Sequence, residues 1–181
     1  MNRLSEDEFR QKKKLPLTVV LDDVRSMHNI GAVFRTADAF LIESVYLCGI
    51  SATPPHQEIH KTALGAEFTV SWKYFRDTVE AVRELRGAGH AIFAIEQCEN
   101  SHKLDQLMEE WRSEAQGDRR LAIVLGNEVK GVKQEVVDLC DGCIEIPQYG
   151  TKHSLNVSVA AGIVMWELST LYLHSQLQRQ V

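Results

Sequence analysis

Three short segments of the chain place polar or charged side chains beside glycine, in patterns that could form a ligand site. Residues 29–36 read NIGAVFRT, residues 126–131 read GNEVKG and residues 144–161 read IEIPQYGTKHSLNVSVAA. Glycine allows a ligand to approach the backbone closely, and the free N–H groups at a helix start bind polar or anionic groups. In the third segment an apolar strand ends at a proline, and a helix opens at Ser-Leu-Asn. We therefore predict that this segment forms the floor of a ligand site.

Each of the three segments follows a predicted buried strand. Short runs rich in valine, isoleucine and leucine predict strands over residues 17–22, 121–126 and 143–146. Ligands of open parallel sheets bind beyond the carboxyl ends of the strands. The polar side chains that follow these three strands are therefore the best candidates for a functional site.

Strands and helices alternate along the rest of the chain. An apolar stripe from Ile30 to Leu41 predicts a helix that Asn29 caps. This alternation predicts an α/β fold, a single domain whose mostly parallel sheet is covered by helices on both faces. Further strands are predicted over residues 44–49, 69–75 and 90–95, and further helices over residues 57–64, 77–86, 104–111, 134–139 and 154–174.

The predicted helix over residues 154–174 is apolar on nearly every side. A helix of this kind is buried by more than one neighbour. Because the chain has only 181 residues, the pattern favours a second subunit as one of those neighbours.

The composition is that of an ordinary globular protein. Of the 181 residues, 44% are hydrophobic and 25% are charged, which excludes a disordered or fibrous chain and favours one domain. No apolar stretch is long enough to span a bilayer. Residues 1–15 are rich in charged side chains, unlike a signal peptide, so we expect a cytoplasmic protein. We divide the chain into a charged arm (1–16), a domain (17–175) and a tail (176–181).

The formal net charge of −5 argues against a protein whose whole surface binds a polyanion. A nucleic-acid contact would therefore be a local patch. The charged arm offers candidates for such a patch, although basic runs are more often simply solvated. They are Arg3, Arg10, Lys12, Lys13 and Lys14.

Cysteines and histidines give no strong indication of a metal site. Cys140 and Cys143 form half of a zinc site without a second pair, and a thioredoxin-type pair would open a helix rather than precede a strand. His56 and His60 are spaced to share a helix face, but no third ligand is spaced to join them. We therefore predict reduced thiols and no metal ion.

Taken together and in this order, the three segments resemble the SpoU (TrmH-like) family of S-adenosylmethionine-dependent RNA ribose 2′-O-methyltransferases, within the SPOUT superfamily. The resemblance covers residues 17–172 and rests on the patterns NxGAxxRT, GxExxG and IPxxGxxxSLNVSVAA. Gln148 replaces the methionine of many members, and no RNA-binding domain is appended. The glycine-rich turn of the commoner methyltransferase class is absent after the first strand, which favours the SpoU family independently.

The resemblance implies a sheet whose carboxyl-terminal segment forms a deep trefoil knot. It also implies a homodimer with active sites near the subunit interface, and S-adenosylmethionine as co-substrate without a metal ion. The implied reaction is methylation of a ribose 2′-hydroxyl of RNA, with tRNA favoured and rRNA as the alternative. The rivals are a catalytically silent RNA-binding protein with the same fold and a methyltransferase of small molecules or proteins.

The same resemblance assigns the central catalytic role to Arg35. A guanidinium stays protonated and is a poor general base, so its chemistry favours orienting a phosphate and stabilising a developing alkoxide. The alternative is a surface arginine paired with Asp38. Asn29 is predicted to position the substrate or Arg35 and to cap its helix. Glu128 is predicted to hold Arg35 or a ribose hydroxyl.

Ser154 and Asn156 are predicted catalytic residues, with capping of the last helix as their alternative role. His153 is a candidate for a pH-dependent role, although loop histidines are usually just solvated. The resemblance implies that the cofactor is held largely by backbone groups after the strands. The residues predicted to bind it are Ile95, Leu125, Gly126, Ile146, Ser154 and Leu155.

Overall fold

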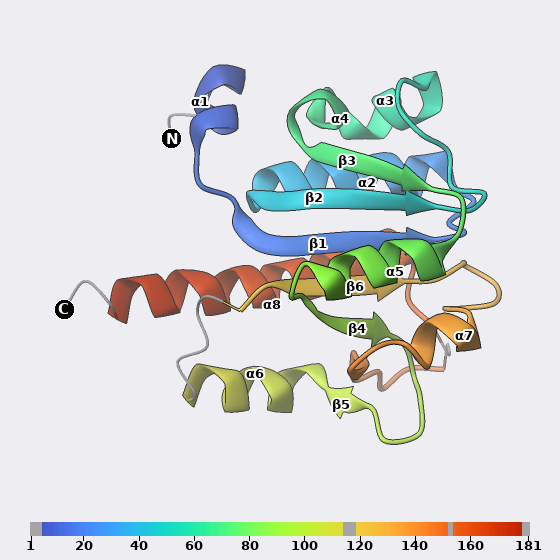
Figure 1. Ribbon diagram of the computed structural model, residues 1–181, viewed down its shortest axis with the longest axis vertical. Coiled ribbons are helices and arrows are strands. Elements are labelled where there is room, and N and C mark those ends of the chain that lie inside the picture. Colours follow the sequence, from blue (N-terminus) through green and yellow to red (C-terminus); the bar gives the residue numbers. More distant parts are fainter. Residues whose placement is uncertain (1–4, 114–118, 152–153, 179–181) are drawn as a thin grey trace.

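The computed structural model describes residues 5–113, 119–151 and 154–178. Within these residues the chain forms a seven-stranded sheet in the order β3-β2-β1-β6-β4-β7-β5, and every strand pair is parallel (Figure 1). The predicted α/β fold with a mostly parallel sheet is therefore confirmed. The strands are β1 (Leu15–Asp22), β2 (Ile42–Cys48), β3 (Ser71–Phe75), β4 (Ala91–Ile95), β5 (His102–Lys103), β6 (Leu121–Leu125) and β7 (Gly142–Glu145).

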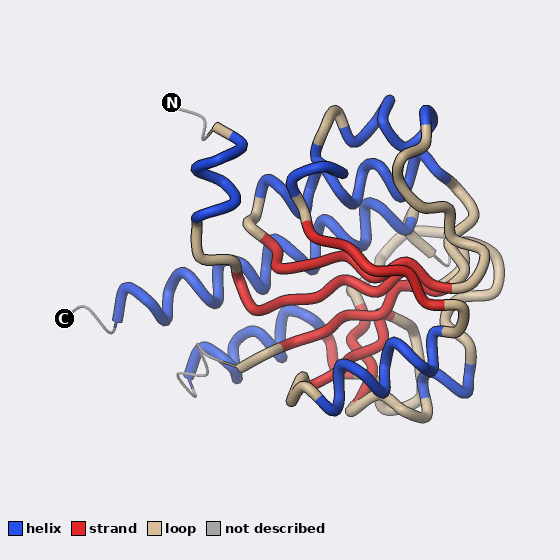
Figure 2. Tube along the Cα trace, turned by 45° about the horizontal axis from the view of Figure 1, so that its top comes forward, coloured by secondary structure: helices blue, strands red, loops and turns tan. Residues whose placement is uncertain are grey.

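Helices cover both faces of the sheet, which is why its central strands are apolar on both sides. One layer includes α2, α6 and α8, and the opposite layer contains α5 and α7 (Figure 2). The helices are α1 (Glu6–Gln11), α2 (Met27–Ala39), α3 (Gln57–Ala63), α4 (Ala66–Thr69), α5 (Thr78–Gly87), α6 (Leu104–Ser113), α7 (Gln134–Val137) and α8 (Val157–Gln178).

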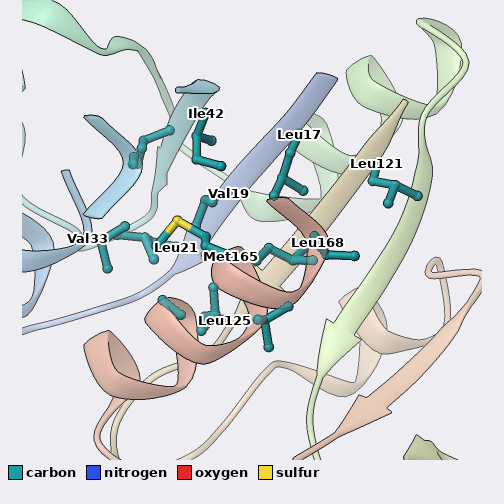
Figure 3. Packing of buried hydrophobic residues seen from close by; sticks show 14 of the residues in the cluster. Leu17, Val19, Leu21, Val33, Ile42, Leu121, Leu125, Met165 and Leu168 are labelled. Atoms are coloured by element: carbon teal, nitrogen blue, oxygen red, sulfur yellow. The ribbon is translucent and has the colours of Figure 1, made fainter. Parts of the chain in front are cut away.

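The larger core cluster lies between β1, α2 and α8. Leu17 and Leu21 of β1 are completely buried there, facing Val33 of α2 and Met165 of α8 (Figure 3). Val20 points to the other face and joins the cluster under α5 and α7. The alternation along β1 thus holds α2 and α8 side by side on one face of the sheet.

Two predicted helix starts are wrong. Ser26 caps α2, because its Oγ accepts a hydrogen bond from the backbone N–H of Asn29 at 3.2 Å. The side chain of Asn29 is therefore not a cap, and it points to other partners from the first turn of the helix. In the same way α8 begins at Val157 rather than at Ser154.

The prediction missed three short elements, α1, α4 and β5. The α4 helix ends at Thr69, so β3 starts two residues later than predicted. A capping box between Ser5 and Glu8 starts α1, whose Phe9 is only 5% exposed. Part of the predicted arm therefore docks on the domain, and β1 begins at Leu15, inside the predicted arm (1–16).

The basic residues in and beside α1 differ in their partners and exposure. Arg10 pairs with Glu6 at 3.7 Å, and the Lys14 ammonium lies 3.2 Å from the centre of the Phe9 ring. Lys12 and Lys13 are exposed and have no ion-pair partner among the described residues. Arg3 lies outside the described residues.

The long helix α8 has an apolar surface that the rest of the described chain does not cover. Val159, Trp166 and Leu173 recur every seven residues and are 50%, 54% and 56% exposed. Trp166 lies against Phe40, just after α2, with ring centres 5.6 Å apart. Although α8 has 22 residues, neither it nor any other described helix combines the length and apolarity needed to cross a membrane.

Candidate active site

The three segments singled out in the sequence meet at the carboxyl edge of the sheet. The turns after β4, β6 and β7 and the start of α8 enclose a cavity of about 370 Å³. All six residues predicted to bind a cofactor line it, although their role in binding remains a prediction. They are Ile95, Leu125, Gly126, Ile146, Ser154 and Leu155.

The turn after β6 folds back on itself and depends on two glycines. The backbones of Asn127 and Gly131 exchange hydrogen bonds of 3.0 and 2.9 Å. A Cβ on Gly126 would lie 2.1 Å from the carbonyl carbon of Gly131. Gly131 itself has a φ of +70°, and a Cβ there would lie 2.4 Å from a carboxylate oxygen of Glu96. Only glycine fits this cavity wall at both positions.

Hydrogen bonds and an ion pair connect the same turn to the end of β1. The amide of Asn127 donates to the carbonyl of Asp23 at 2.8 Å, and the ammonium of Lys133 lies 2.8 Å from the Asp23 carboxylate. The hydrogen bond to Asp23 raises the pKa of Lys133. The backbone N–H of Lys133 also donates to the buried carboxylate of Asp22 at 3.1 Å. These bonds hold the second segment beside the first.

Glu128, Asn29 and Asn156 form a continuous chain of hydrogen bonds, which we call the Glu128–Asn29–Asn156 network. The amide nitrogen of Asn29 donates to Glu128 at 3.1 Å. The amide oxygen of Asn29 accepts from the side chain of Asn156 at 3.1 Å and from Ser158 at 3.4 Å. One predicted residue from each of the three segments thus takes part. Asn156 also caps α8, since its oxygen accepts from the N–H of Ser158 at 2.9 Å.

Two backbone groups fix the carboxylate of Glu128 as well. The N–H groups of Arg25 and Ser26 each donate to it at 3.1 Å. Partial desolvation by itself raises the pKa of Glu128. Hydrogen bonds from its own backbone N–H, from these two donors and from Asn29 outweigh that effect, so the pKa lies below its ordinary value. Glu128 is therefore ionised at neutral pH and acts as an acceptor. It makes no bond to Arg35 of its own chain among the described residues, and both roles predicted for it stay predictions.

Arg35 lies apart from this network. It follows Asn29 by six residues of α2, which places it about 120° around the helix and about 9 Å along its axis. Its exposed side chain has no ion-pair or hydrogen-bond partner among the described residues. No ion pair joins it to Asp38 in the described part of the chain, and the Asp38 carboxylate accepts from the hydroxyl of Thr69 at 2.6 Å. Arg35 instead lines a separate cavity of about 610 Å³ beside α1 and α4.

The remaining predicted positions have simpler surroundings. Ser154 lies at the rim of the 370 Å³ cavity, and its exposed hydroxyl has no hydrogen-bond partner in the described part of the chain. His153 lies outside the described residues. His56 caps α3, and His60 pairs with the buried Glu67 at 2.6 Å. Within the described ranges no three histidine, cysteine or acidic side chains are grouped as metal ligands would be.

Sequence reasoning missed two carboxylates in the cavity wall, Glu96 and Glu145. Glu96 accepts from the N–H of Val132 at 3.1 Å, and Glu145 accepts from the hydroxyl of Ser101 at 2.9 Å. Glu96 directly follows β4, so the rule that polar residues after strands form sites could have found it. Glu145 belongs to the third segment, but it was predicted to lie inside a strand over residues 143–146, whereas it is the last residue of β7.

The family comparison agrees with this geometry. The family model described as the SpoU rRNA Methylase family matches residues 16–166, which is most of the chain. The chain belongs to the SpoU family. The recognition made from the three segments is thereby confirmed.

Individual SpoU proteins resemble the chain over most of its length. The 23S rRNA (guanosine-2′-O-)-methyltransferase RlmB of Vibrio vulnificus is 33% identical over 97% of the chain and 68% of its own length. The A. aeolicus TrmH/SpoU tRNA modifying enzyme has a TM-score of 0.79 at 27% identity, over 95% of the chain and 84% of its own. An AdoMet-bound rRNA methyltransferase from Sinorhizobium meliloti has a TM-score of 0.75 at 26% identity, over 90% and 59%. For several further SpoU relatives, the chain spans 62% to 64% of their length.

Proposed function

We propose that the protein transfers a methyl group from S-adenosylmethionine to a ribose 2′-hydroxyl of RNA, with tRNA as the favoured substrate and rRNA as the alternative. The observation that carries the proposal is that Glu128 belongs both to the cavity wall and to the Glu128–Asn29–Asn156 network. A space for a cofactor and a set of fixed polar groups therefore adjoin each other. The SpoU relatives support the reaction class, since one is named for guanosine 2′-O-methylation and another was solved with AdoMet.

The cavity suits S-adenosylmethionine in size and chemistry. Its volume of about 370 Å³ falls within the range of about 300–1,000 Å³ that is usual for small-molecule sites. Ile95, Leu125 and Ile146 give it apolar walls, while Glu96 and Glu145 add carboxylates that attract a positively charged sulfonium. When bound, the cofactor supplies an electrophilic methyl group.

We assign the network the role of holding the substrate ribose. The amide nitrogens of Asn29 and Asn156 each donate one of their two hydrogens within the network. Each keeps a second hydrogen that a substrate oxygen could accept. Because Glu128 fixes the Asn29 amide in place, little reorganisation is needed when the substrate binds. Ser154 at the cavity rim is a further donor on this side.

Arg35 is assigned to the RNA phosphate and to the developing alkoxide, because a protonated guanidinium stabilises negative charge. Its place on α2 is away from the cavity of its own chain. We therefore propose that Arg35 serves the cavity of a second subunit in a homodimer. The uncovered apolar stripe of α8 at Val159, Trp166 and Leu173 supports a second copy as the partner.

Family membership also supports the knot and the location in our proposal. β6 lies between β1 and β4 in the sheet, and α8 returns from β7 to lie against β1 and α2. This is the arrangement in which the SpoU resemblance implies a trefoil knot. We also propose that the protein acts in the cytoplasm, where an RNA substrate would be encountered.

The experiment that tests the function uses methyl-labelled S-adenosylmethionine and total RNA. After incubation with the protein, the RNA is fractionated, digested to nucleosides and mapped. We expect label in 2′-O-methylated nucleosides of tRNA, whereas label confined to rRNA would select the alternative substrate. Label in protein or small molecules would overturn the proposal. Calorimetric titration that detects no cofactor binding would support a silent RNA-binding protein instead.

A further inference from the structure

Two cysteines that are distant in the sequence touch each other in the fold. The Sγ atoms of Cys98 and Cys143 are 2.6 Å apart. Cys98 lies in the turn after β4, and Cys143 lies in β7, the strand that pairs with β4. A disulfide requires an S–S distance of about 2.05 Å. Only a small shift of the two side chains would therefore bring the sulfurs to bonding distance.

The cysteine that the sequence suggested as the partner of Cys143 is engaged elsewhere. The thiol of Cys140 donates to the backbone carbonyl of Val136 at 3.2 Å. Burial raises the pKa of Cys140 to about 12, as it does for Cys143, so the geometry and not the pKa distinguishes the two thiols. Cys48 is completely buried in β2, at the other side of the sheet order from β7. The structure thus selects Cys98 and Cys143 from the four cysteines.

The two thiols differ in their access to solvent. Cys98 is half-buried, whereas Cys143 is 7% exposed. Burial raises the pKa of Cys143 to about 12, which keeps it in the thiol form at neutral pH. Cys98 is therefore the thiol that a small oxidant in solution reaches first, and Cys143 is the thiol that lies ready beside it.

We propose that Cys98 and Cys143 are an oxidation site that hydrogen peroxide closes to a disulfide. In the first step, the sulfur of Cys98 attacks a peroxide oxygen, the O–O bond breaks, and the products are a Cys98 sulfenic acid and water. In the second step, the sulfur of Cys143 attacks the sulfenic sulfur. The S–O bond breaks, and the hydroxyl leaves with the Cys143 proton as a second water. Both sulfurs are oxidised by one electron and the peroxide is reduced by two.

The bridge would join two walls of the candidate cofactor cavity. Glu96 and Gln97 precede Cys98 directly and line the cavity, and Ile144 and Glu145 follow Cys143 and line it too. A covalent bond in place of the 2.6 Å contact fixes the turn after β4 to β7. Because Glu96 also fixes the turn after β6 through the N–H of Val132, the oxidised form holds three cavity segments in a tighter arrangement. We expect this arrangement to bind S-adenosylmethionine more weakly.

The first test is to map the bond in the full chain. The reduced protein is treated with hydrogen peroxide, free thiols are alkylated, and the protein is digested without reductant for mass spectrometry. We expect an intact chain lighter by two hydrogen atoms, a linked peptide pair containing Cys98 and Cys143, and complete reversal by dithiothreitol. A link through Cys48 or Cys140, or a link between two chains, would overturn the site.

Two serine variants are the matched controls. Cys98→Ser should lose the bridge completely, whereas Cys140→Ser should form it as the unaltered chain does. Thermal midpoints measured in reductant show whether Cys98→Ser still folds as the reduced protein does. A bridge that persists in Cys98→Ser would contradict the proposal, and so would its loss in Cys140→Ser.

The second test measures the affinity of the oxidised and reduced forms for S-adenosylmethionine by calorimetry. We expect oxidation to weaken binding by about threefold or more, and to have no effect on Cys98→Ser. Equal affinities of the oxidised and reduced protein would overturn the link between the thiols and the cavity. The bond itself is mapped without cofactor or RNA, so its outcome is independent of the proposed methyl transfer.

Discussion

Asn29 and Arg35 belong to the same sequence segment and the same helix, but their surroundings differ in kind. The amide of Asn29 is held from both sides, by Glu128 and by Asn156. The guanidinium of Arg35 is exposed and has no partner among the described residues. One residue is thus fixed before any ligand arrives. The other keeps its full hydrogen-bonding capacity.

The difference follows from helix geometry. Six residues of an α-helix turn through about 600°, so the two side chains leave α2 about 120° apart. Residues of one sequence motif can therefore have different surroundings in the fold. The predictions below challenge this division between a fixed network and a free arginine.

The largest effect is expected from Arg35→Ala. If the guanidinium stabilises charge in the transition state, its loss should lower kcat by about 10²- to 10³-fold. The affinity for S-adenosylmethionine should stay unchanged, since Arg35 does not line that cavity. Methyl transfer to the mapped RNA and calorimetry measure the two quantities. Arg83→Ala, an exposed arginine on α5, is the control and should keep full activity.

Mixing two inactive variants tests whether Arg35 acts across a dimer. In a heterodimer of Arg35→Ala with Asn156→Ala, one site would combine an intact network with an intact arginine from the other chain. Random exchange of subunits should then restore about a quarter of the sites. Activity that stays at the level of the separate variants would show that Arg35 serves its own chain, and the division we draw would fail.

The next effect concerns the fixed side of the comparison. Gly126→Ala places a Cβ 2.1 Å from backbone atoms of Gly131 and Val132, which no side-chain rotation relieves. We expect a loss of about 1–3 kcal/mol in the free energy of unfolding and weaker binding of S-adenosylmethionine, measured by denaturation and calorimetry. Gly87→Ala, where a Cβ meets nothing within 4 Å, is the control. Unchanged cofactor affinity in Gly126→Ala would remove this turn from the proposed site.

The surroundings of Asn29 and Arg35 also show what the sequence could and could not predict. The order of the elements followed from apolar runs and glycines, because burial imposes periodicity locally. The pairing of segments at one sheet edge followed from the rule for parallel sheets. The orientation of Arg35 was missed because the resemblance assigned it a role without regard to the turn of α2.

Features that depend on tertiary packing could not be predicted either. Ser26 and Asn29 are both good caps, and only the packing of α2 decides between them. Glu145 and the Cys98–Cys143 contact depend on which strands become neighbours, and β7 pairs with β4 rather than with β6, the preceding strand in the sequence. Local pattern carries no information on such pairings, which is why the nearby Cys140 was the cysteine that the sequence suggested.

Glu128→Gln should have a smaller effect that depends on pH. The folded-state pKa of Glu128 lies below the ordinary value, so its charge stabilises the protein above that value and the stabilisation is lost as pH falls through the folded pKa. We expect the variant to be less stable by about 1 kcal/mol at neutral pH, a modest figure because the side chain is exposed. The difference should start to shrink near the ordinary glutamate pKa of about 4.3 and vanish only below the lower pKa of the folded state. Urea denaturation across pH measures it, with Glu80→Gln as the control, and a difference that persists in acid would exclude the charge as its cause.

Trp166→Glu tests whether a second copy covers the α8 stripe. A charge in the middle of the proposed apolar interface should weaken self-association by about 10- to 100-fold, measured by analytical ultracentrifugation. Phe68→Glu, at an exposed aromatic residue on α4 away from α8, should leave association unchanged. A variant that remains as strongly associated as the unaltered protein would leave Arg35 without its proposed partner site.

The smallest effect is expected from Lys12→Ala with Lys13→Ala, the basic residues of the arm that the fold leaves free. If both ammonium groups contact phosphates, their removal should make the negative slope of log affinity against log salt shallower by about 1.4 to 1.8. Affinity for all RNAs should fall together, since phosphate contacts carry no base information. Arg76→Ala with Arg83→Ala removes the same charge from exposed positions in and beside α5 and should leave the slope unchanged. An unchanged slope in the lysine variant would mean that the docked α1 places no cation on the RNA, and an equal reduction in both double variants would mean that net charge alone is sensed.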